Sequence, residues 1–384
     1  MNRLRIIINT TNLRKGGALQ ASSALIEDLK KNKKHEFHIM LSPAMSNFIQ
    51  KENLPSHMKF YECDYPRKIA SSLINKELDD LERKILPDCV FSVFGPTYWK
   101  PKSPHIMGFA NGLYLFDDLP FYKKMELKSK IWEFIRKHYH RHLLRKYAPQ
   151  FVVETDLVRA RLSKFLKIQK ARITVIPNAF HSVFNNEIRD LGLLPKKETN
   201  EFRFITVSSF YKHKNLEIIN RIIPLLEKES IQCKFILTIT KKEFEKHFDY
   251  KSPYLLNIGP VDVNQCPYLY HNCDALFLPT LVECFSVSYL EAMKSKIPII
   301  TSDYDFSRGI CEDAALYFDP FDEIDIFEKI KLVIDTPALR QELVINGESK
   351  LKTYPDSSSR TESYIEECQK LLEENKIGDN HHAK

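Results

Sequence analysis

Short apolar runs, rich in β-branched and aromatic residues, alternate with helix-length segments along almost the whole chain. The first half holds such runs at 5–9, 36–41, 58–62, 89–94, 105–110, 151–155 and 173–177. The second half holds them at 202–209, 233–240, 255–259, 275–279 and 297–303, and 315–319 adds an edge strand. Runs of this kind, separated by helices and bounded by polar, Pro or Gly residues, indicate βαβ units and parallel sheets. The sequence therefore predicts an α/β protein with two doubly wound, Rossmann-like domains.

The break between the two halves lies at 181–200. This segment is polar and poorly periodic, and it contains one Gly and one Pro, which is typical of a linker. We therefore expect a first domain over 1–180, a second over 201–355, and a C-terminal helix within 356–384 that packs back toward the first domain. Ligands of open α/β sheets bind past the carboxyl ends of the strands. Two such ends facing a cleft would form one two-sided site.

The charge balance is mildly basic, because lysine and arginine exceed aspartate and glutamate by 57 − 50 = 7. This excess suits an anionic small molecule or an anionic membrane surface, and we expect no nucleic acid partner. No apolar run approaches the ~20 residues of a membrane span, and the N-terminal run is too short for a signal peptide. We therefore expect a cytoplasmic protein, with peripheral contact at the inner face of the membrane as an option. The eight cysteines include no C-x-x-C pair, which favours buried thiols over metal ligands or disulfides.

Two glutamates follow the apolar run 275–279 and lie eight residues apart. Glu283 is expected in the loop at the carboxyl end of this strand, and Glu291 on the next helix, two turns further on. Backbone N–H groups at a helix start lack internal partners and attract phosphate or sugar hydroxyls. The spacing is too wide for an acid and a base that act on one bond, but it suits carboxylates at opposite ends of an elongated ligand. On spacing alone, a solvated loop glutamate and a helix-surface glutamate are the preferred interpretation.

The surrounding sequence changes this preference. The segment 259–303, GPVDVNQCPYLYHNCDALFLPTLVECFSVSYLEAMKSKIPIITSD, resembles the donor-binding half of family 4 glycosyltransferases, which have the GT-B fold. The E-x7-E-A pattern of that family begins at Glu283, and the resemblance continues into 308–320. It covers the second domain closely and the first domain in outline. Where the family has two glycines in its E-G-F-G-L-P stretch, this chain has Cys284 and Ser286.

The resemblance implies a role for each part of this motif. The first glutamate of the motif contacts hydroxyls of the donor sugar, and this role falls on Glu283. The second holds the ribose of the nucleotide, and this role falls on Glu291. The backbone that would face the sugar and the diphosphate belongs to Phe285, Ser286 and Val287.

A leaving nucleoside diphosphate needs fixed positive charge where its own negative charge develops. The family has an Arg after the first strand of the second domain and a Lys five residues later. Lys214 matches the Lys, Ser209 stands at the Arg position, and Lys212 is the candidate for a second positive charge. The alternative is that both lysines are ordinary residues at a helix start, although helix N-termini disfavour cations.

The first domain offers fewer candidates. Gly16 and Gly17 precede a helix after the first strand, and paired glycines there allow close backbone approach to a ligand. They resemble the family's first-domain glycine loop, which faces the donor diphosphate and the acceptor. Gly17 is the preferred donor contact, and Gly16 is assigned to the acceptor side. The family's histidine near the fifth strand has no counterpart within 108–116, where Asn111 is the nearest polar candidate on the acceptor side.

The segment 121–147 carries nine Lys or Arg residues against two Glu, with Trp132 and Phe134 among them. A basic helix with exposed aromatic residues is typical of an element that contacts an anionic membrane surface. It would also suit a lipid-diphosphate acceptor. The alternative is a solvated helix that packs its apolar stripe on the core.

Taken together, the resemblance implies a retaining glycosyltransferase of hexosyltransferase type. It would move a sugar from a nucleotide diphosphate sugar to an acceptor hydroxyl, in surface polysaccharide or lipid-linked glycan synthesis. Glu283 and Lys214 are the catalytic candidates, and neither a metal nor another cofactor is expected. The D-x-D string at 303–305 is interpreted as structural. Two alternatives remain: a nucleotide-sugar epimerase on the same scaffold, and a non-catalytic binder of nucleotide sugars.

Overall fold

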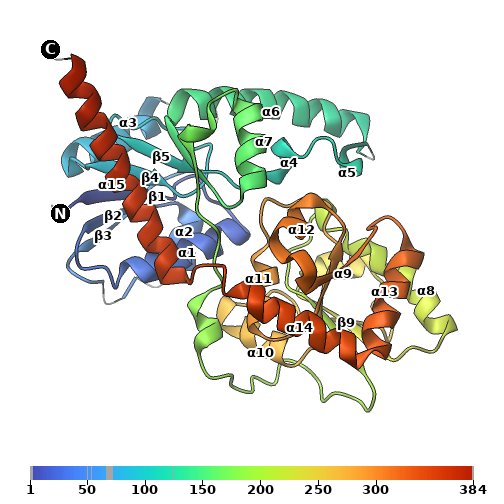
Figure 1. Ribbon diagram of the computed structural model, residues 1–384. Helices are drawn as coiled ribbons and strands as arrows, with labels where there is room; N and C mark the ends of the chain where they lie inside the picture. Colours follow the sequence, from blue (N-terminus) through green and yellow to red (C-terminus); the bar gives the residue numbers. More distant parts are fainter. Residues whose placement is uncertain (1–2, 50, 53, 66–71, 124, 383–384) are drawn as a thin grey trace. The chain divides into compact units, whose positions relative to one another are not determined.

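The computed structural model describes residues 3–382 except 50, 53, 66–71 and 124 (Figure 1). Its internal contacts divide the chain into two units. Unit 1 comprises Met1–Leu115, Met125–Pro177 and Ser357–Lys384, and unit 2 comprises Phe116–Lys124 and Asn178–Asp356. The predicted first domain, 1–180, includes residues 116–124. In the structure, the ring of Phe116 packs edge-on against Phe306 of unit 2, with centroids 5.9 Å apart.

Unit 1 is built on a seven-stranded sheet in which every adjacent pair is parallel. The strand order is β3-β2-β1-β4-β5-β6-β7, so the order reverses between β1 and β4, the kind of position at which open α/β sheets bind ligands. The strands are β1 (Arg5–Asn9), β2 (Glu36–Leu41), β3 (Met58–Glu62), β4 (Cys89–Ser92), β5 (His105–Gly108), β6 (Gln150–Val153) and β7 (Ile173–Val175).

Helices connect most of these strands, as is usual for parallel pairs, although the segment 93–104 joins β4 to β5 without a helix. In unit 1 they are α1 (Gly17–Leu29), α2 (Pro43–Phe48), α3 (Ser72–Ile85), α4 (Gly112–Leu115), α6 (Leu127–Tyr147), α7 (Asp156–Leu166) and α15 (Ser357–His382). Local signals fix several of their ends. For example, the Thr155 hydroxyl accepts a hydrogen bond from the Val158 amide at 3.1 Å and caps α7.

The C-terminal helix α15 is part of unit 1, where it packs on α1 and β4 (red beside blue in Figure 1). Its side chains Ile365, Cys368 and Leu371 are buried in the same core cluster as the apolar residues of α1. At its first turn, the hydroxyls of Ser357 and Thr361 donate to the buried carboxylate of Asp28 on α1. Residues at the end of the chain therefore complete the unit with which the chain begins.

Unit 2 contains a six-stranded sheet, again with only parallel pairs, in the order β10-β9-β8-β11-β12-β13. Its strands are β8 (Phe202–Thr206), β9 (Cys233–Leu237), β10 (Leu255–Asn257), β11 (Ala275–Leu278), β12 (Ile299–Ser302) and β13 (Ala315–Phe318). Its α-helices are α5 (Pro120–Lys123), α8 (Ile219–Lys228), α9 (Lys241–His247), α10 (Cys266–His271), α11 (Val287–Lys294), α12 (Asp305–Cys311), α13 (Glu323–Asp335) and α14 (Pro337–Leu351).

Every strand predicted from the sequence is present in these two sheets, and β13 lies at an edge as predicted. Several predicted runs extend too far at their carboxyl ends. The run 202–209, for example, ends as a strand at Thr206, because the following residues turn away into the loop before η3 (Lys212–Lys214). The expected linker 181–200 is also partly built into unit 2, since Phe184 and Leu194 pack in its core.

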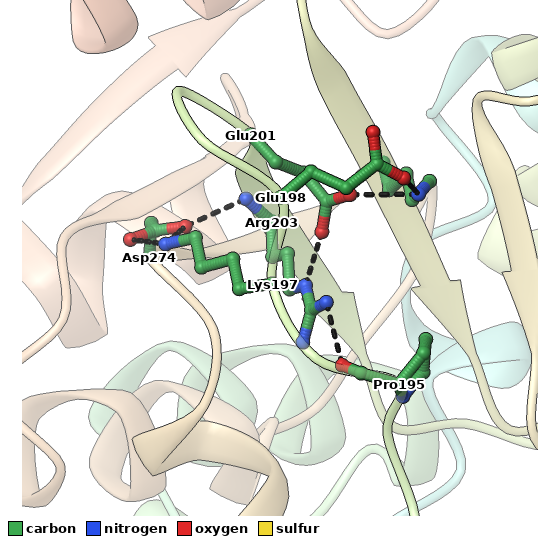
Figure 2. Close-up of polar contacts among 7 residues, drawn as sticks. Pro195, Lys197, Glu198, Glu201, Arg203 and Asp274 are labelled. Atoms are coloured by element: carbon green, nitrogen blue, oxygen red, sulfur yellow. Dashed lines mark hydrogen bonds and ion pairs between the residues drawn. The ribbon is translucent and has the colours of Figure 1, made fainter.

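A network of charged side chains lies at the amino edge of the unit 2 sheet (Figure 2). Arg203, only 2% exposed at the start of β8, donates to Glu201, and Lys234 at the start of β9 donates to the other oxygen of Glu201 at 2.7 Å. Arg203 also donates to the Pro195 carbonyl at 2.9 Å. Because a buried charge is tolerated only when paired, this network ties the segment before β8 to the sheet.

The same network reaches the residue before β11. Asp274 accepts a hydrogen bond from the Arg203 amide at 2.7 Å and from the Lys197 ammonium at 2.6 Å (Figure 2). Its partners come from the segment before β8 and from β8 itself. These contacts hold the amino ends of the central strands in register and leave the carboxyl edge free for loops.

Two whole-chain properties follow from the described residues. None of the helices traced within them has the length and apolar composition that crossing a bilayer requires. All eight cysteines are buried free thiols, as the sequence predicted.

Candidate active site

Two loops bring Lys214 and Glu283 together past the carboxyl edge of the unit 2 sheet. Lys214 ends η3, which follows β8, and Glu283 lies in the loop between β11 and α11. The Lys214 ammonium donates to Oε1 of Glu283, and the two side chains are 16% and 12% exposed. The sequence-predicted catalytic candidates are therefore an ion pair that is largely screened from water but still accessible.

Backbone and hydroxyl contacts hold this ion pair in place. The Leu281 amide donates to the His213 carbonyl at 2.7 Å, which joins the loop after β11 to η3. The Thr280 hydroxyl lies 3.0 Å from Oε1 of Glu283 and 3.2 Å from the same carbonyl. Burial lowers the pKa of the His213 imidazole, so this neighbour is neutral at pH 7. Charge at the site therefore comes from Lys214 and Glu283.

The start of α11 lies directly after Glu283. Ser286 is the N-cap residue in an extended conformation, and its side chain makes no capping hydrogen bond. Val287 is the first helical residue and is half-buried, whereas Phe285 is buried with its ring edge-on to Tyr354, 5.9 Å between centroids. Backbone N–H groups that no side chain caps are suited to an anion or a hydroxyl.

Glu291 lies one turn further along α11 and is only 7% exposed. The Tyr270 hydroxyl on α10 donates to its Oε2 at 2.9 Å. Burial raises the pKa of the Glu291 carboxyl to about 7, and the Tyr270 hydrogen bond opposes this rise. The interpretation of the two glutamates as a solvated pair is therefore wrong, because one is ion-paired and the other is buried.

The remaining unit 2 candidates lie in the loop between β8 and η3. Ser209 is exposed, and its carbonyl accepts a hydrogen bond from the Ser208 hydroxyl at 2.9 Å. Lys212 is exposed at the first position of η3 and forms no ion pair with any residue that the structure describes. Both follow the carboxyl end of β8, as Lys214 does, so they border the same edge of the sheet.

The unit 1 candidates lie at the carboxyl edge of their own sheet. Gly16 is the N-cap of α1 with φ 75°, a conformation that favours glycine, and Gly17 is the exposed first residue of that helix. A side chain at Gly17 would meet open space. Asn111 follows β5, is half-buried, and its carbonyl accepts from the Tyr114 amide at 3.2 Å. Gly16, Gly17 and Asn111 belong to unit 1, whereas the Lys214–Glu283 pair belongs to unit 2.

Sequence reasoning missed several polar residues at these edges. In unit 2 they are Tyr270, whose partner Glu291 lies on another helix, and Thr280, which contacts Glu283 in its own loop and the His213 carbonyl at η3. In unit 1, His140 on α6 lies 2.7 Å from the hydroxyls of Tyr98 and Tyr114, which follow β4 and β5. His140 lies outside 108–116 in the sequence, and only the fold brings α6 to the loops after β4 and β5.

Among the residues that the structure describes, no three His, Cys, Asp or Glu side chains gather where they could hold a metal ion. In the D-x-D string, Asp303 accepts two hydrogen bonds from Arg308, and Asp305 begins α12.

Residues 194–350 match the model of the family described as glycosyl transferases group 1. Among curated proteins, the O-antigen chain mannosyltransferase RfbU of Salmonella typhimurium is 25% identical over 213 residues. That alignment covers 53% of this chain and 57% of RfbU, so the match spans little more than half the length of that relative.

Solved structures match over nearly the whole chain. A complex of HepE from Anabaena with UDP and glucose has a TM-score of 0.68 at 12% identity, covering 96% of this chain and 100% of that one. WaaG, a glycosyltransferase involved in lipopolysaccharide biosynthesis, has a TM-score of 0.70 at 13% identity and covers 94% and 98%. A glycosyltransferase from Rickettsia africae has a TM-score of 0.71 at 14% identity and covers 97% and 99%. The chain has the GT-B fold.

The group 1 match places all the unit 2 candidates of this GT-B chain within one recognised segment. That segment runs from the residues before β8 to α14, and includes Lys214, Glu283 and Glu291. Chemically, these residues provide a fixed cation, an uncapped helix start and two carboxylates at one sheet edge. Such an arrangement can hold an anion at one point and hydroxyl groups on either side of it.

Proposed function

We propose that this chain is a retaining hexosyltransferase that moves a sugar from a nucleotide diphosphate sugar to an acceptor hydroxyl. The observation that carries the proposal is the Lys214–Glu283 pair at the carboxyl edge of the unit 2 sheet, directly before the start of α11. The group 1 match over the same segment supports it. A cation and a carboxylate held together there fit a ligand that carries both a diphosphate and hydroxyl groups.

Each side chain has a part in the proposed reaction. Lys214 and the N–H groups at the start of α11 stabilise the leaving diphosphate as its charge grows. Glu283 accepts hydrogen bonds from hydroxyls of the transferred sugar, and Glu291 from the ribose. The bond between the anomeric carbon and the diphosphate oxygen breaks, and the acceptor oxygen bonds to that carbon on the same face. The acceptor proton passes to the leaving diphosphate.

The proposal includes the absence of a metal requirement. Lys214 and the exposed Lys212 provide the positive charge that a metal would supply elsewhere. Transfer in the presence of EDTA should therefore equal transfer without it. A loss of turnover in EDTA that Mg²⁺ or Mn²⁺ restores would contradict this part of the proposal.

The proposed acceptor is a glycan or a lipid-linked glycan of a surface polysaccharide. The support is the match to RfbU, whose name describes an O-antigen chain mannosyltransferase. The same match makes a mannosyl donor the first to test, and the HepE complex with UDP-glucose makes a glucosyl donor the second.

We also propose that α6 contacts an anionic membrane surface. The predicted segment 121–147 is not one element, since α5 belongs to unit 2, α6 belongs to unit 1, and Lys124 lies outside the described residues. The buried residues of α6, namely His140, Leu143 and Leu144, all lie in its C-terminal half. In its N-terminal half the large apolar side chains are exposed: Leu127, Ile131, Trp132, Phe134 and Ile135. In this half of α6, therefore, the apolar side chains do not pack on the core, contrary to the alternative.

Vesicle binding tests this contact. The protein should sediment with vesicles that contain phosphatidylglycerol and remain in solution with phosphatidylcholine alone, because basic residues surround the exposed apolar side chains. Trp132→Ser should weaken binding, whereas Ile345→Ser, which removes an exposed apolar side chain of α14, should not. Equal sedimentation of both variants with anionic vesicles would contradict a role for α6.

The main experiment measures nucleoside diphosphate release from UDP-, GDP- and dTDP-sugars, with lipid-linked glycans as acceptors. Wild type should release one nucleoside diphosphate, and Glu283→Ala should abolish this release. Glu229→Ala is the matched control, because it breaks a surface ion pair with Lys331 of the same unit. The anomeric configuration of the product, read by NMR, tests retention.

Two other outcomes identify the alternatives. Conversion of the donor sugar to its epimer, without release of nucleoside diphosphate, would indicate an epimerase. Tight binding of a nucleoside diphosphate without turnover on any donor and acceptor pair would indicate a non-catalytic binder. The sequence gives a reason to test for the second outcome, since Ser209, Cys284 and Ser286 stand where the family has Arg and Gly.

A further inference from the structure

Two helices on either side of β11 are joined by polar contacts of one tyrosine, Tyr270, with Glu291 and Ser288. Tyr270 is the penultimate residue of α10, which precedes β11, and Glu291 lies on α11, which follows it. The Tyr270 side chain is fully buried, and its hydroxyl donates to Oε2 of Glu291 at 2.9 Å. Tyr270 lies 21 residues before Glu291 and therefore outside the E-x7-E motif.

The Glu291 carboxyl lies in apolar surroundings that do not hold a charge by themselves. It belongs to a helix whose neighbouring residues Tyr289, Leu290, Ala292 and Met293 are all buried in the core of unit 2. Tyr270 is the hydrogen-bond donor that the structure provides, and no described residue donates to the second oxygen, Oε1. One carboxyl oxygen is thus held in place, and the other remains available to a ligand.

The Tyr270 ring is itself fixed. It packs edge-on against Phe184 of the segment that precedes β8, with ring centroids 5.6 Å apart, and it is surrounded by the same core cluster. A tyrosine that cannot move presents its hydroxyl at one point. Binding groups held by such supporting residues lose less entropy when the ligand arrives.

We infer that Tyr270 is the positioning residue for Glu291, which it orients so that Oε1 accepts the ribose hydroxyls of the nucleotide. This inference rests on the proposed function, because it assumes that Glu291 binds a nucleotide. It adds a residue outside the E-x7-E segment to the donor site. Tyr270 acts through Glu291 and does not itself touch the ligand.

A purely structural role for Tyr270 predicts a different outcome, and Tyr289 provides the comparison. Tyr289 is fully buried in the same core cluster, and its hydroxyl lies 2.9 Å from the hydroxyl of Thr301. Removing either phenolic oxygen breaks hydrogen bonding in the core of unit 2. Only removal of the Tyr270 oxygen releases the carboxyl of Glu291.

The experiment measures UDP and GDP binding by calorimetry, and donor KM and kcat, for Tyr270→Phe, Tyr289→Phe, Glu291→Ala and Tyr270→Phe/Glu291→Ala. Tyr270→Phe should raise the nucleotide Kd and the donor KM about 10-fold, the usual effect of losing a hydrogen bond to a charged group, with kcat within about 2-fold. Tyr289→Phe should leave Kd within about 2-fold. In the Glu291→Ala background, which has no acceptor for the Tyr270 hydroxyl, adding Tyr270→Phe should change Kd by less than about 2-fold.

The outcomes separate this inference from the proposed function. Absence of UDP or GDP binding by the wild type would overturn both. Binding by the wild type with equal losses in Tyr270→Phe and Tyr289→Phe would overturn the inference alone. So would a Tyr270→Phe loss that is fully retained when Glu291 is already Ala.

Discussion

The Lys214 ammonium and the Glu283 carboxylate neutralise each other in the absence of a ligand. In the proposed reaction they serve different parts of the donor, the diphosphate and the sugar. A bound diphosphate would compete with Glu283 for Lys214 and leave the carboxylate to accept hydroxyl groups. The pair therefore holds both side chains in place before the donor arrives.

This arrangement predicts unequal effects for the two lysines of η3. Lys214→Ala should lower kcat/KM for the donor by about 100-fold or more, because a fixed charge is removed where negative charge develops. Lys212→Ala should lower it less than about 10-fold, since Lys212 is exposed and forms no ion pair with the described residues. The measurement is the rate of nucleoside diphosphate release at low donor concentration. Equal losses in both variants would contradict a special role for Lys214.

Glu291 gives unit 2 a pH dependence with a defined sign. Burial raises the pKa of its carboxyl from 4.5 to about 7, so between these values the folded state binds more protons than the unfolded state. Stability is therefore lost as pH rises through this window, by about 3 kcal/mol in total. Glu291→Gln removes the titration, so its stability relative to wild type should increase by that amount between pH 4.5 and 7.

Calorimetric unfolding of wild type and Glu291→Gln at a series of pH values checks this prediction. Glu229→Gln is the control, because Glu229 lies in a partly exposed surface ion pair. Parallel curves for wild type and Glu291→Gln would show that the buried carboxyl does not titrate in this range.

At the scale of elements, the amino edge of the unit 2 sheet depends on the charged network of Figure 2. Glu201→Ala would leave the buried Arg203 guanidinium without its carboxylate, which typically costs about 3–5 kcal/mol. Arg221→Ala breaks an exposed pair with Glu323 and should cost at most about 1 kcal/mol. Denaturant unfolding followed by circular dichroism measures both. A Glu201→Ala cost as small as that of Arg221→Ala would mean that water reaches Arg203 and replaces the pair.

The sequence predicts the strands well because parallel strands buried on both faces must be continuous apolar runs, and residues such as Ile6–Ile8 and Phe204–Ile205 leave no other interpretation. Their carboxyl ends are predicted less well, since apolar residues such as Val207 continue into the loop. The resemblance to the family also identifies Glu283 and Lys214 as candidates for the site. It does not predict Tyr270, His140 or the network at Arg203, because their partners lie on other elements.

At the scale of the molecule, both tryptophans, Trp99 and Trp132, belong to unit 1. Tryptophan fluorescence therefore reports the unfolding of unit 1 alone. Unit 2 can be followed in the same sample by calorimetry, so the two units can be assigned separate transitions. This property allows truncations to be read unit by unit.

A chain ended after Asp356 should lose stability in unit 1. Removal of α15 exposes the core positions that Ile365, Cys368 and Leu371 cover, and burial of each large apolar side chain contributes roughly 1.5–3 kcal/mol. The tryptophan transition should move to much lower denaturant or be lost, while the unit 2 transition stays within error. Ending the chain after Glu374 keeps all three side chains and should leave both transitions unchanged. Loss of the unit 2 transition in the first truncation would contradict the division into units.

The placement of α15 also sets the order in which the protein can be completed during synthesis. All residues of unit 2 are translated before the last helix of unit 1. Since domains generally fold as units while the chain grows, the nascent chain completes its second unit first. Until α15 is translated and packs, the surface of α1 around Asp28 lacks this helix. A chain that stops before α15 would thus lack part of the unit whose synthesis began first.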